Sequence, residues 1–316
     1  MSEIRSYHGQ PVLKEPVWTW EIPCYFFTGG VAGGSAGLAF LAGARGNDVL
    51  ARRAWAAALA GVTASPALLI SDLGRPERFF NMLRMFKVTS PMSVGSWVLS
   101  ASGAATALAA ANAWTGAFPR SARLARPAAA LLGLPLSTYT AALIADTAVP
   151  AWHAARRELP FVFASGAALS AGAAAVIATP PELARPARRL ALATAAAEVG
   201  TTELMKRRLG ELGEPYHQGE AHKFGRLSQA GIGLGAALLA SRGGRSRAAA
   251  VAAGVLLGAG ALSARWSVFK AGFRSASDPR YVVAPQREGI DRGDRRGAAR
   301  RGSRLQLGAR RVARVE

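Results

Sequence analysis

The apolar residues of this chain fall into long stretches, and this pattern constrains the fold more than any other feature. About eight stretches rich in Ala, Gly and Leu each approach the roughly 20 residues that an α-helix needs to cross a bilayer. We expect them at residues 22–44, 52–73, 92–114, 127–149, 160–180, 187–206, 224–241 and 247–269. The sixth and seventh are the least hydrophobic. The predicted fold is all-α, a polytopic membrane helix bundle of about eight transmembrane helices.

Charged residues gather between these stretches, which supports the same interpretation. They make up 18% of the chain and give a formal net charge of +20, and many are paired arginines such as Arg52-Arg53 and Arg156-Arg157. Loops that cap membrane helices have this composition, and basic loops bind anionic lipid. Because no nucleic-acid-binding motif accompanies the charge, we expect membrane lipid and no nucleic acid as a partner.

The chain is predicted to have four parts. A polar N-terminal segment at 1–21 precedes an eight-helix transmembrane domain at 22–270, a short ordered tail at 271–288 and a basic Gly/Arg-rich disordered tail at 289–316. The last part has too few apolar residues to fold. With eight helices both termini lie on one side of the cell membrane, and the arginines of the tail favour the cytoplasmic side.

Small residues follow a regular spacing in the first stretch. Gly29, Gly33 and Gly37 recur every four residues, and Gly30 with Gly34 repeats that spacing one residue later. Lipid provides no hydrophobic drive between helices, so small residues that allow close backbone approach supply the packing. We therefore expect this ridge to be a helix-packing surface. It lacks the preceding strand and the spacing of a phosphate-binding loop.

Cysteine and histidine usage excludes several cofactors. The single cysteine, Cys24, rules out an internal disulfide and a cluster held by several thiolates of this chain. A transmembrane b-type haem usually takes two buried histidines from facing helices. The four histidines lie outside the middle of the apolar stretches, at His8, His153, His217 and His222. We therefore expect no haem, and no metal or flavin motif appears in the chain.

Tyrosines and ionisable residues within the stretches concentrate toward one leaflet. Odd stretches start, and even stretches end, at the leaflet that faces the termini. The residues placed there are Tyr25, Asp72, Tyr139, Asp146, Glu198, Glu203 and Arg265. An ionisable group within the membrane is costly and is a functional candidate by default. Structural alternatives exist, because Asp72 can pair with Arg75 or Arg78, Tyr139 can be an interface anchor, and Glu203 can pair with Lys206 or Arg207.

A hydroxyl donor, a carboxylate and a cation at one leaflet suit a quinone headgroup. The quinone carbonyl oxygens accept hydrogen bonds, and quinone reduction takes up two protons that titratable groups must relay. The candidate catalytic residues are Asp72, Tyr139, Asp146 and Glu198, and the candidate quinone-binding residues are Tyr25, Tyr139 and Asp72. The same acids suit a proton or solute transporter, which would be active without a partner.

Five short motifs carry a resemblance to a known family. They are WEIPCYFFTGG at 20–30, DLGRPERF at 72–79, SPMSVGSW at 90–97, TYTAALIADTAVP at 138–150 and DPRYVVAPQRE at 278–288. Together they resemble the NrfD family, the membrane subunits of polysulfide-reductase-like complexes, over about residues 18–288. The DLGRPERF motif is the most specific of the five.

The resemblance implies a haem-free, eight-helix, non-autonomous subunit of an oxidoreductase complex, polysulfide reductase- or formate dehydrogenase-like. Such a subunit exchanges electrons between menaquinone or ubiquinone and a four-cluster ferredoxin-like iron–sulfur subunit, which serves a molybdopterin catalytic subunit. By motif position, Tyr139 matches the family's fourth-helix tyrosine, which hydrogen-bonds the quinone. Asp72 matches the family's second-helix aspartate, which lies near the quinone. Some members use Asn and His at the start of the first helix, where this chain has Cys24 and Tyr25.

The resemblance also gives a role to the basic loop at 74–91. Its four cations would face the iron–sulfur partner, and they are Arg75, Arg78, Arg84 and Lys87. Contact with lipid headgroups is the alternative for these residues. A cytochrome-b-type anchor and a purely structural anchor remain alternatives for the whole chain.

Overall fold

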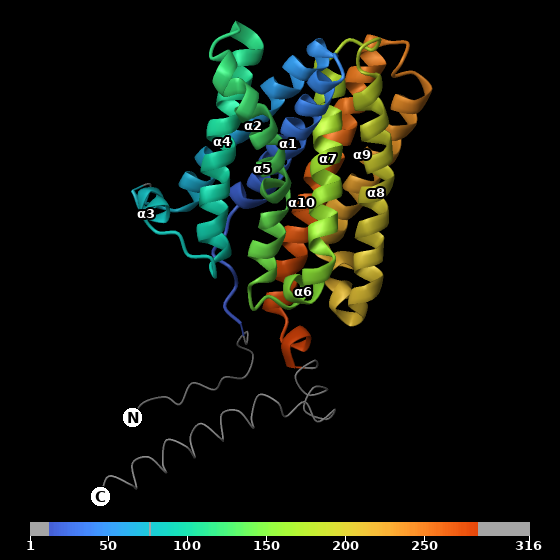
Figure 1. Cartoon of the computed structure of the whole chain (residues 1–316). Helices are drawn as coiled ribbons and strands as arrows, with labels where there is room; N and C mark the ends of the chain where they lie inside the picture. The colour runs from blue at the N-terminus through green and yellow to red at the C-terminus, as the bar shows by residue number, and fades with distance from the viewer. Residues whose placement is uncertain (1–12, 76, 284–316) are drawn as a thin grey trace, which may run out of the picture.

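The computed structural model describes residues 13–75 and 77–283, and within them eight long helices lie side by side (Figure 1). They are α1 (Glu21–Ala44), α2 (Asp48–Asp72), α4 (Pro91–Thr115), α5 (Pro119–Ala145), α7 (Leu159–Ala178), α8 (Arg185–Leu209), α9 (Gly219–Ser241) and α10 (Arg247–Ser277). Four short helices connect them: α3 (Arg78–Arg84), α6 (Pro150–Ala154), η1 (Ala155–Arg157) and η2 (Gly210–His217). The prediction of an all-α membrane helix bundle is confirmed.

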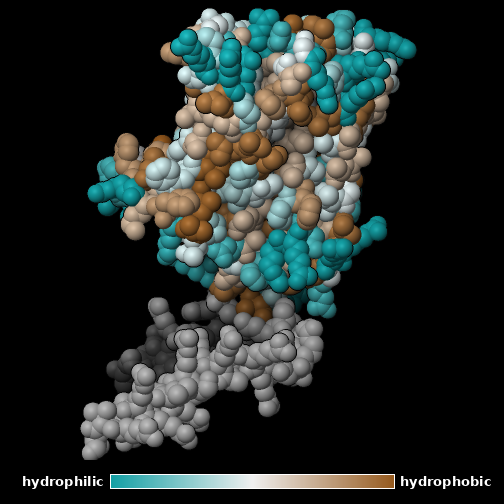
Figure 2. Space-filling model, viewed as in Figure 1, coloured by the Kyte–Doolittle hydropathy of each residue, from teal (hydrophilic) through white to brown (hydrophobic). Residues whose placement is uncertain are grey.

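Six of the long helices are long and apolar enough to cross a membrane, namely α1, α2, α4, α5, α7 and α10. The two others, α8 and α9, correspond to the stretches predicted to be the least hydrophobic. On the face drawn in Figure 2, a largely apolar band crosses the middle of the bundle, and polar side chains cover both of its ends. The protein is a multi-pass membrane protein.

The long helices form two groups that meet along α1, α5 and α7. In the N-terminal group α1 packs on α2 and α5, and α4 packs on α2 and α5. In the C-terminal group α10 packs on α9 and α7, and α7 packs on α8. The elements α6, η2 and the end of α10 contact one another at the lower end in Figure 1, which we call the loop face, whereas α3 projects from the side of the bundle.

Side-chain caps set the starts of three long helices. Asn47 accepts a hydrogen bond from the Leu50 amide at 3.1 Å ahead of α2, Ser90 accepts one from Ser93 ahead of α4, and Ser246 accepts one from Ala249 ahead of α10. These bonds satisfy amides that the helix itself leaves without a partner. A glycine ends α4. Gly116 adopts a left-handed conformation at φ 73°, which favours glycine.

The glycine ridge of α1 is a packing surface, as predicted. A methyl group at Gly33 would collide with the backbone of Gly133 in α5, and one at Gly34 would lie 2.7 Å from the carbonyl oxygen of Ala167 in α7. Glycine therefore brings α1 into backbone contact with both neighbours. Gly37 is different, because an added methyl group there would meet no atom within 4 Å.

The ends of two helices differ from the prediction. The fourth stretch was expected at 127–149, but α5 begins at Pro119 and ends at Ala145. Pro150 disfavours helical geometry in the residue before it, and proline pre-organises the first turn of the next helix, α6. Likewise, α10 continues to Ser277 rather than ending at 269. The predicted disordered tail at 289–316 lies outside the described residues.

Candidate functional site

Three candidate residues, Tyr25, Asp72 and Tyr139, line one cavity in the N-terminal group. We call this cavity the aromatic pocket, and its volume is about 70 Å³. Its walls come from α1, α2, α4 and α5, together with α3 and the segment before α1. The helix directions inferred from the sequence therefore placed these three side chains at a common depth, and the structure brings them into one site.

The two tyrosines meet edge-on in this pocket. Their ring centroids lie 6.3 Å apart, with an interplanar angle of 64°. The Tyr25 hydroxyl is buried and has no hydrogen-bond partner among the described residues. Gly95 of α4 makes room for the Tyr139 ring, because a methyl group at that position would collide with it. The pocket thus presents tyrosine hydroxyls within a largely apolar wall.

Asp72 lies at the C-terminal end of α2 and is half-buried. Its Oδ1 atom accepts hydrogen bonds from the Thr19 amide at 3.2 Å and from the Thr19 hydroxyl at 3.1 Å. Within the described residues no salt bridge joins Asp72 to Arg75 or Arg78, and both arginines are exposed. Backbone and hydroxyl donors therefore orient this carboxylate at the pocket wall.

The remaining walls of the aromatic pocket come from residues that sequence reasoning did not single out. Trp18 stacks on Trp152 of α6 with ring centroids 5.7 Å apart, and Phe79 and Met82 enter from α3. Met92 and Ser96 complete the wall from α4. Phe79 lies in the DLGRPERF motif, and Met92 and Ser96 lie in the SPMSVGSW motif, so these motifs could have signalled them. Met82 lies in neither motif, and α3 has no buried residue that would have marked it.

The other four residues predicted at this leaflet lie outside the aromatic pocket, and Asp146 and Glu203 are two of them. Asp146 follows the last residue of α5 and is exposed, rather than lying within a membrane span as expected. Its place follows from the early end of α5. Glu203 of α8 forms the predicted ion pair with Lys206 at 2.9 Å, and it also accepts a hydrogen bond from Gln229 of α9 at 3.0 Å.

Glu198 lies in a separate cavity of the C-terminal group, which we call the Glu198 cavity. The residue is 1% exposed, and its Oε2 atom accepts a hydrogen bond from Ser165 of α7 at 2.7 Å. The cavity is small, about 20 Å³. Besides Glu198 its polar lining includes Thr202 and Tyr216, together with Glu203, Lys206 and Gln229. No residue lines both this cavity and the aromatic pocket.

Arg265 of α10 is the counter-charge beside Glu198. It is 2% exposed and donates hydrogen bonds to the carbonyl oxygens of Phe163 at 2.9 Å and Val162 at 3.3 Å. Its guanidinium lies 4.2 Å from the centroid of the Phe163 ring. A methyl group at Gly166 would lie 2.9 Å from both Glu198 oxygens and would collide with the guanidinium. Glycine at this position therefore lets the two charges flank α7.

The four cations of the loop after α2 are all exposed, as are several large apolar side chains beside them. The cations are Arg75, Arg78, Arg84 and Lys87. Among the apolar neighbours, Phe80 is 71% exposed and Met85 is 74% exposed. This segment is a basic and apolar surface at the side of the bundle.

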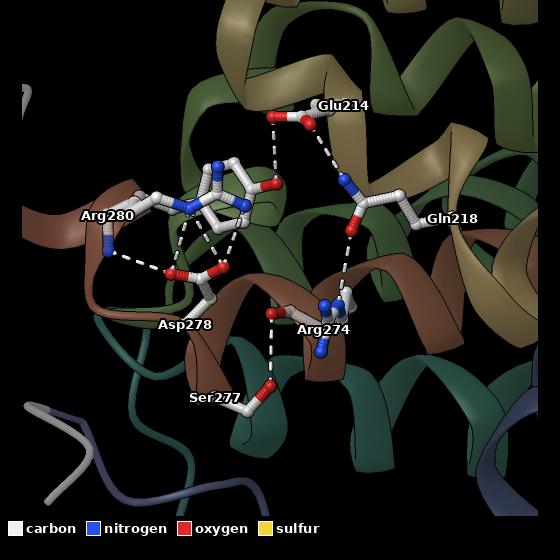
Figure 3. Close-up of polar contacts among 7 residues, drawn as sticks. Glu214, Gln218, Arg274, Ser277, Asp278 and Arg280 are labelled. Atoms are coloured by element: carbon white, nitrogen blue, oxygen red, sulfur yellow. Dashed lines mark hydrogen bonds and ion pairs between the residues drawn. The ribbon is translucent and has the colours of Figure 1, made fainter. Parts of the chain in front are cut away.

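A polar cluster joins the residues after α10 to η2 at the loop face (Figure 3). The Tyr281 hydroxyl donates to Glu214 at 3.1 Å, Gln218 donates to Glu214 at 2.7 Å, and Arg274 donates to Gln218 at 3.3 Å. Hydrogen bonds from Arg280 hold the pKa of Asp278 below its usual value. Burial raises the pKa of Tyr216 in η2, so its phenol remains protonated. We call this cluster the loop-face cap.

Within residues 13–75 and 77–283, no group of three or more His, Cys, Asp or Glu side chains is placed to hold a metal ion. The aromatic pocket and the Glu198 cavity are the two cavities that contain residues predicted from the sequence to be catalytic. The aromatic pocket is lined mainly by aromatic and other apolar side chains, whereas the Glu198 cavity combines an apolar lining with hydroxyl, carboxylate, amide and amine groups.

Comparison with known proteins gives one match, which covers the N-terminal part of the chain. A family model described as polysulphide reductase, NrfD, matches residues 7–191, which is more than half of the chain. No curated protein matches the sequence. The matched region contains α1 to α7 and every residue of the aromatic pocket, and it ends in α8 before Glu198.

Proposed function

Because this chain belongs to the NrfD family, we propose that it is the quinone-reactive membrane subunit of an oxidoreductase complex. Subunits of this family generally partner with iron–sulfur and molybdopterin subunits. The observation that carries the proposal is the convergence of Tyr25, Asp72 and Tyr139 in the aromatic pocket.

The residues of the aromatic pocket fit a quinone headgroup. A quinone ring needs an apolar, aromatic-lined slot with hydrogen-bond donors for its carbonyl oxygens. The buried Tyr25 hydroxyl, which has no partner among the described residues, and the Tyr139 hydroxyl are such donors. At about 70 Å³ the cavity is smaller than a ring requires. Because methionine side chains adapt readily, Met82 and Met92 are the wall residues that would move aside.

Each polar residue has a separate role in this proposal. A bound quinone supplies an acceptor for two electrons and two protons. Tyr139 donates a hydrogen bond to a quinone carbonyl oxygen and so fixes the orientation of the ring. Asp72, oriented by Thr19, holds a proton at its carboxylate beside the pocket and exchanges it with water at the membrane surface. Tyr25 packs on Tyr139 and provides a second donor.

The exposed basic segment after α2 is the proposed surface for the iron–sulfur partner. Arg78 lies at the start of α3 and Arg84 at its end, and α3 also contributes Phe79 and Met82 to the aromatic pocket. A partner docked on α3 would therefore lie next to the pocket. A four-cluster ferredoxin-like subunit, which serves a molybdopterin catalytic subunit, is the partner that the family resemblance favours.

Quinol turnover by the purified complex tests this function. In Tyr139→Phe we expect turnover with quinone to be lost, because the ring packing is kept while the donor is removed. The partner's activity with a soluble dye should remain. Thr138→Val is the matched control, because it removes one hydroxyl from the adjacent position of α5 and does not line the pocket. Unchanged quinone turnover in Tyr139→Phe at equal complex assembly would contradict the proposal.

A further inference from the structure

The Glu198 cavity gathers buried polar atoms that lack hydrogen-bond partners among the described residues. These atoms are Oε1 of Glu198, Oγ1 of Thr202 and Oη of Tyr216. All three residues line the same cavity, between α8, α9, α10 and η2. Buried polar groups in proteins are almost always satisfied by protein or by water. Three such atoms around one space therefore point to a shared occupant.

The occupant that fits is a single water molecule. A cavity holds one water when its volume exceeds roughly 10–15 Å³ and two to four polar partners surround it. The Glu198 cavity has about 20 Å³ and the three orphan atoms. Among the described residues no group of three or more His, Cys, Asp or Glu side chains is placed to hold a metal ion here, and Glu198 is balanced by the nearby Arg265 guanidinium. The cavity is thus the size and polarity of a one-water site.

The polar lining continues from this cavity toward the loop face. Glu198, Thr202 and Lys206 follow one another at intervals of four residues, so they lie on one face of α8. Lys206 binds Glu203, whose side chain is 36% exposed. A chain of polar groups therefore links a fully buried carboxylate to the membrane surface. On the other side, Ser165 and the packed residues of α7 close the site.

The charged and titratable groups around Glu198 come from three elements. Arg265 faces it from α10, and Tyr216 faces it from η2. Glu203 and Lys206 belong to α8 itself, and His217 of η2 lies near Glu203. From α7 the facing side chain is Ser165, and from α9 the facing side chains are Ser228 and Gln229, none of which titrates.

We propose that Glu198 is a proton-exchange site, connected to the loop face through one water held by Thr202 and Tyr216. The Glu198 carboxylate takes up one proton from bulk water by way of the Glu203–Lys206 pair and the bound water, and it releases that proton by the same route. No electron transfer is involved. The site does not depend on quinone binding, because it shares no lining residue with the aromatic pocket.

Infrared difference spectroscopy of the full-length chain in lipid nanodiscs tests the proposal. Lowering the pH should produce a carbonyl stretching band of a buried carboxylic acid, which Glu198→Gln should abolish. In D2O this band should shift, which reports exchange of the Glu198 proton with solvent. Glu182→Gln is the matched control, because Glu182 is an exposed acid outside the cavity, and it should leave the band unchanged.

Thr202→Val and Tyr216→Phe test the water path without removing the carboxylate or its counter-charge. Each should slow the deuterium shift of the Glu198 band severalfold, because each deletes one hydroxyl that holds the water. A band that persists in Glu198→Gln, or a shift equally fast in wild type and in both hydroxyl variants, would overturn the proposal. Loss of quinone turnover in Tyr139→Phe is measured separately, so the two proposals can fail independently.

Discussion

The aromatic pocket and the Glu198 cavity handle buried polar groups in opposite ways. In the pocket, Asp72 and Tyr139 are only half-buried, and flexible methionines and α3 form part of the wall. At the cavity, Glu198 is almost fully buried, and so is Arg265, which lies beside Glu198 but does not line the cavity. The comparison indicates that the carboxylate of one half of the bundle stays within reach of solvent, whereas the carboxylate of the other half is kept inside beside a counter-charge.

The energetic consequences differ accordingly. An uncompensated charge within the membrane is far more costly than a half-exposed carboxylate, which water can still solvate. Substitutions that leave Glu198 or Arg265 charged without the other should therefore reduce stability, whereas substitutions in the aromatic pocket should mainly reduce binding and turnover.

Arg265→Met should have the largest effect on stability. It leaves the Glu198 carboxylate buried without its counter-charge, and breaking a buried pair in this way typically costs about 3–5 kcal/mol. Chemical unfolding of the protein in detergent would measure the loss. Arg274→Met is the matched control on the same helix, because Arg274 is exposed and its loss should cost less than about 1 kcal/mol.

A double variant sharpens the same test. In Arg265→Met combined with Glu198→Gln, the isolated charge is gone and only an amide remains beside Ser165. We expect this variant to recover a large part of the stability lost in Arg265→Met, because the two substitutions share one interaction. Additive losses would show that the two charges do not compensate one another.

Gly95→Ala should disturb the aromatic pocket. The new methyl group collides with the Tyr139 ring, so the ring must move. Displacement of an orienting group by about 1 Å can lower turnover by as much as about a hundredfold, while overpacking costs about 1–3 kcal/mol. Quinol turnover and unfolding of the same preparation would separate the two effects.

Gly103→Ala provides the control for that experiment. Gly103 lies two helical turns further along α4, and a methyl group there would meet no atom within 4 Å. Quinol turnover of the Gly103→Ala variant should equal that of the wild type. If both glycine variants lose turnover equally, the loss comes from α4 itself and not from contact with Tyr139.

Asp72→Asn should affect turnover while hardly changing stability. The side chain keeps an oxygen that can accept from Thr19, so unfolding should change by less than about 1 kcal/mol. Turnover should fall because the amide cannot carry a proton. Thr19→Val keeps the carboxylate and the bond from the Thr19 amide, and it should retain most of the activity. Equal losses in both variants would assign Asp72 to positioning rather than to proton transfer.

The sequence predicts how deep these groups lie in the membrane more reliably than it predicts which helices are neighbours. Alternating helix directions put Tyr25, Asp72 and Tyr139 at one end of the bundle, and in the structure the three residues line one pocket. Depth alone does not say which helices are adjacent, so Glu198 was grouped with them although it lies in another cavity. Lateral neighbours depend on packing, such as the close approach of Gly33 to Gly133, which a single sequence does not pair.

Irregular segments account for the other differences between the prediction and the structure. Tyr216 lies in the short helix η2, where no hydrophobic period predicts the direction of a side chain, so its place in the Glu198 cavity could not be foreseen. Asp146 was expected within a span because its stretch is apolar, but the helix ends just before it. The structure of a connecting segment depends on the elements that it covers, which are distant in sequence.

The smallest expected effect concerns the loop-face cap, which joins η2 to the end of α10. The pKa of Asp278 is lowered by hydrogen bonds from Arg280, so the folded state binds its proton less readily than the unfolded chain does. The pair therefore stabilises the protein above the ordinary aspartate pKa of about 3.9, and this contribution is lost as the pH falls through the lowered pKa.

Unfolding of wild type and Asp278→Asn across that pH range measures the contribution. The stability difference should be present near neutral pH and should vanish in acid, and it should be small because Arg280 is exposed. A stability difference that does not change with pH would show that packing rather than charge stabilises the cap. Tyr281 and Glu214 join this cap to η2, which carries Tyr216 of the Glu198 cavity. Asp278→Asn should therefore leave quinone turnover at the aromatic pocket unchanged. A loss of quinone turnover in Asp278→Asn would therefore break the separation of the two cavities, since no residue of the cap lines the aromatic pocket.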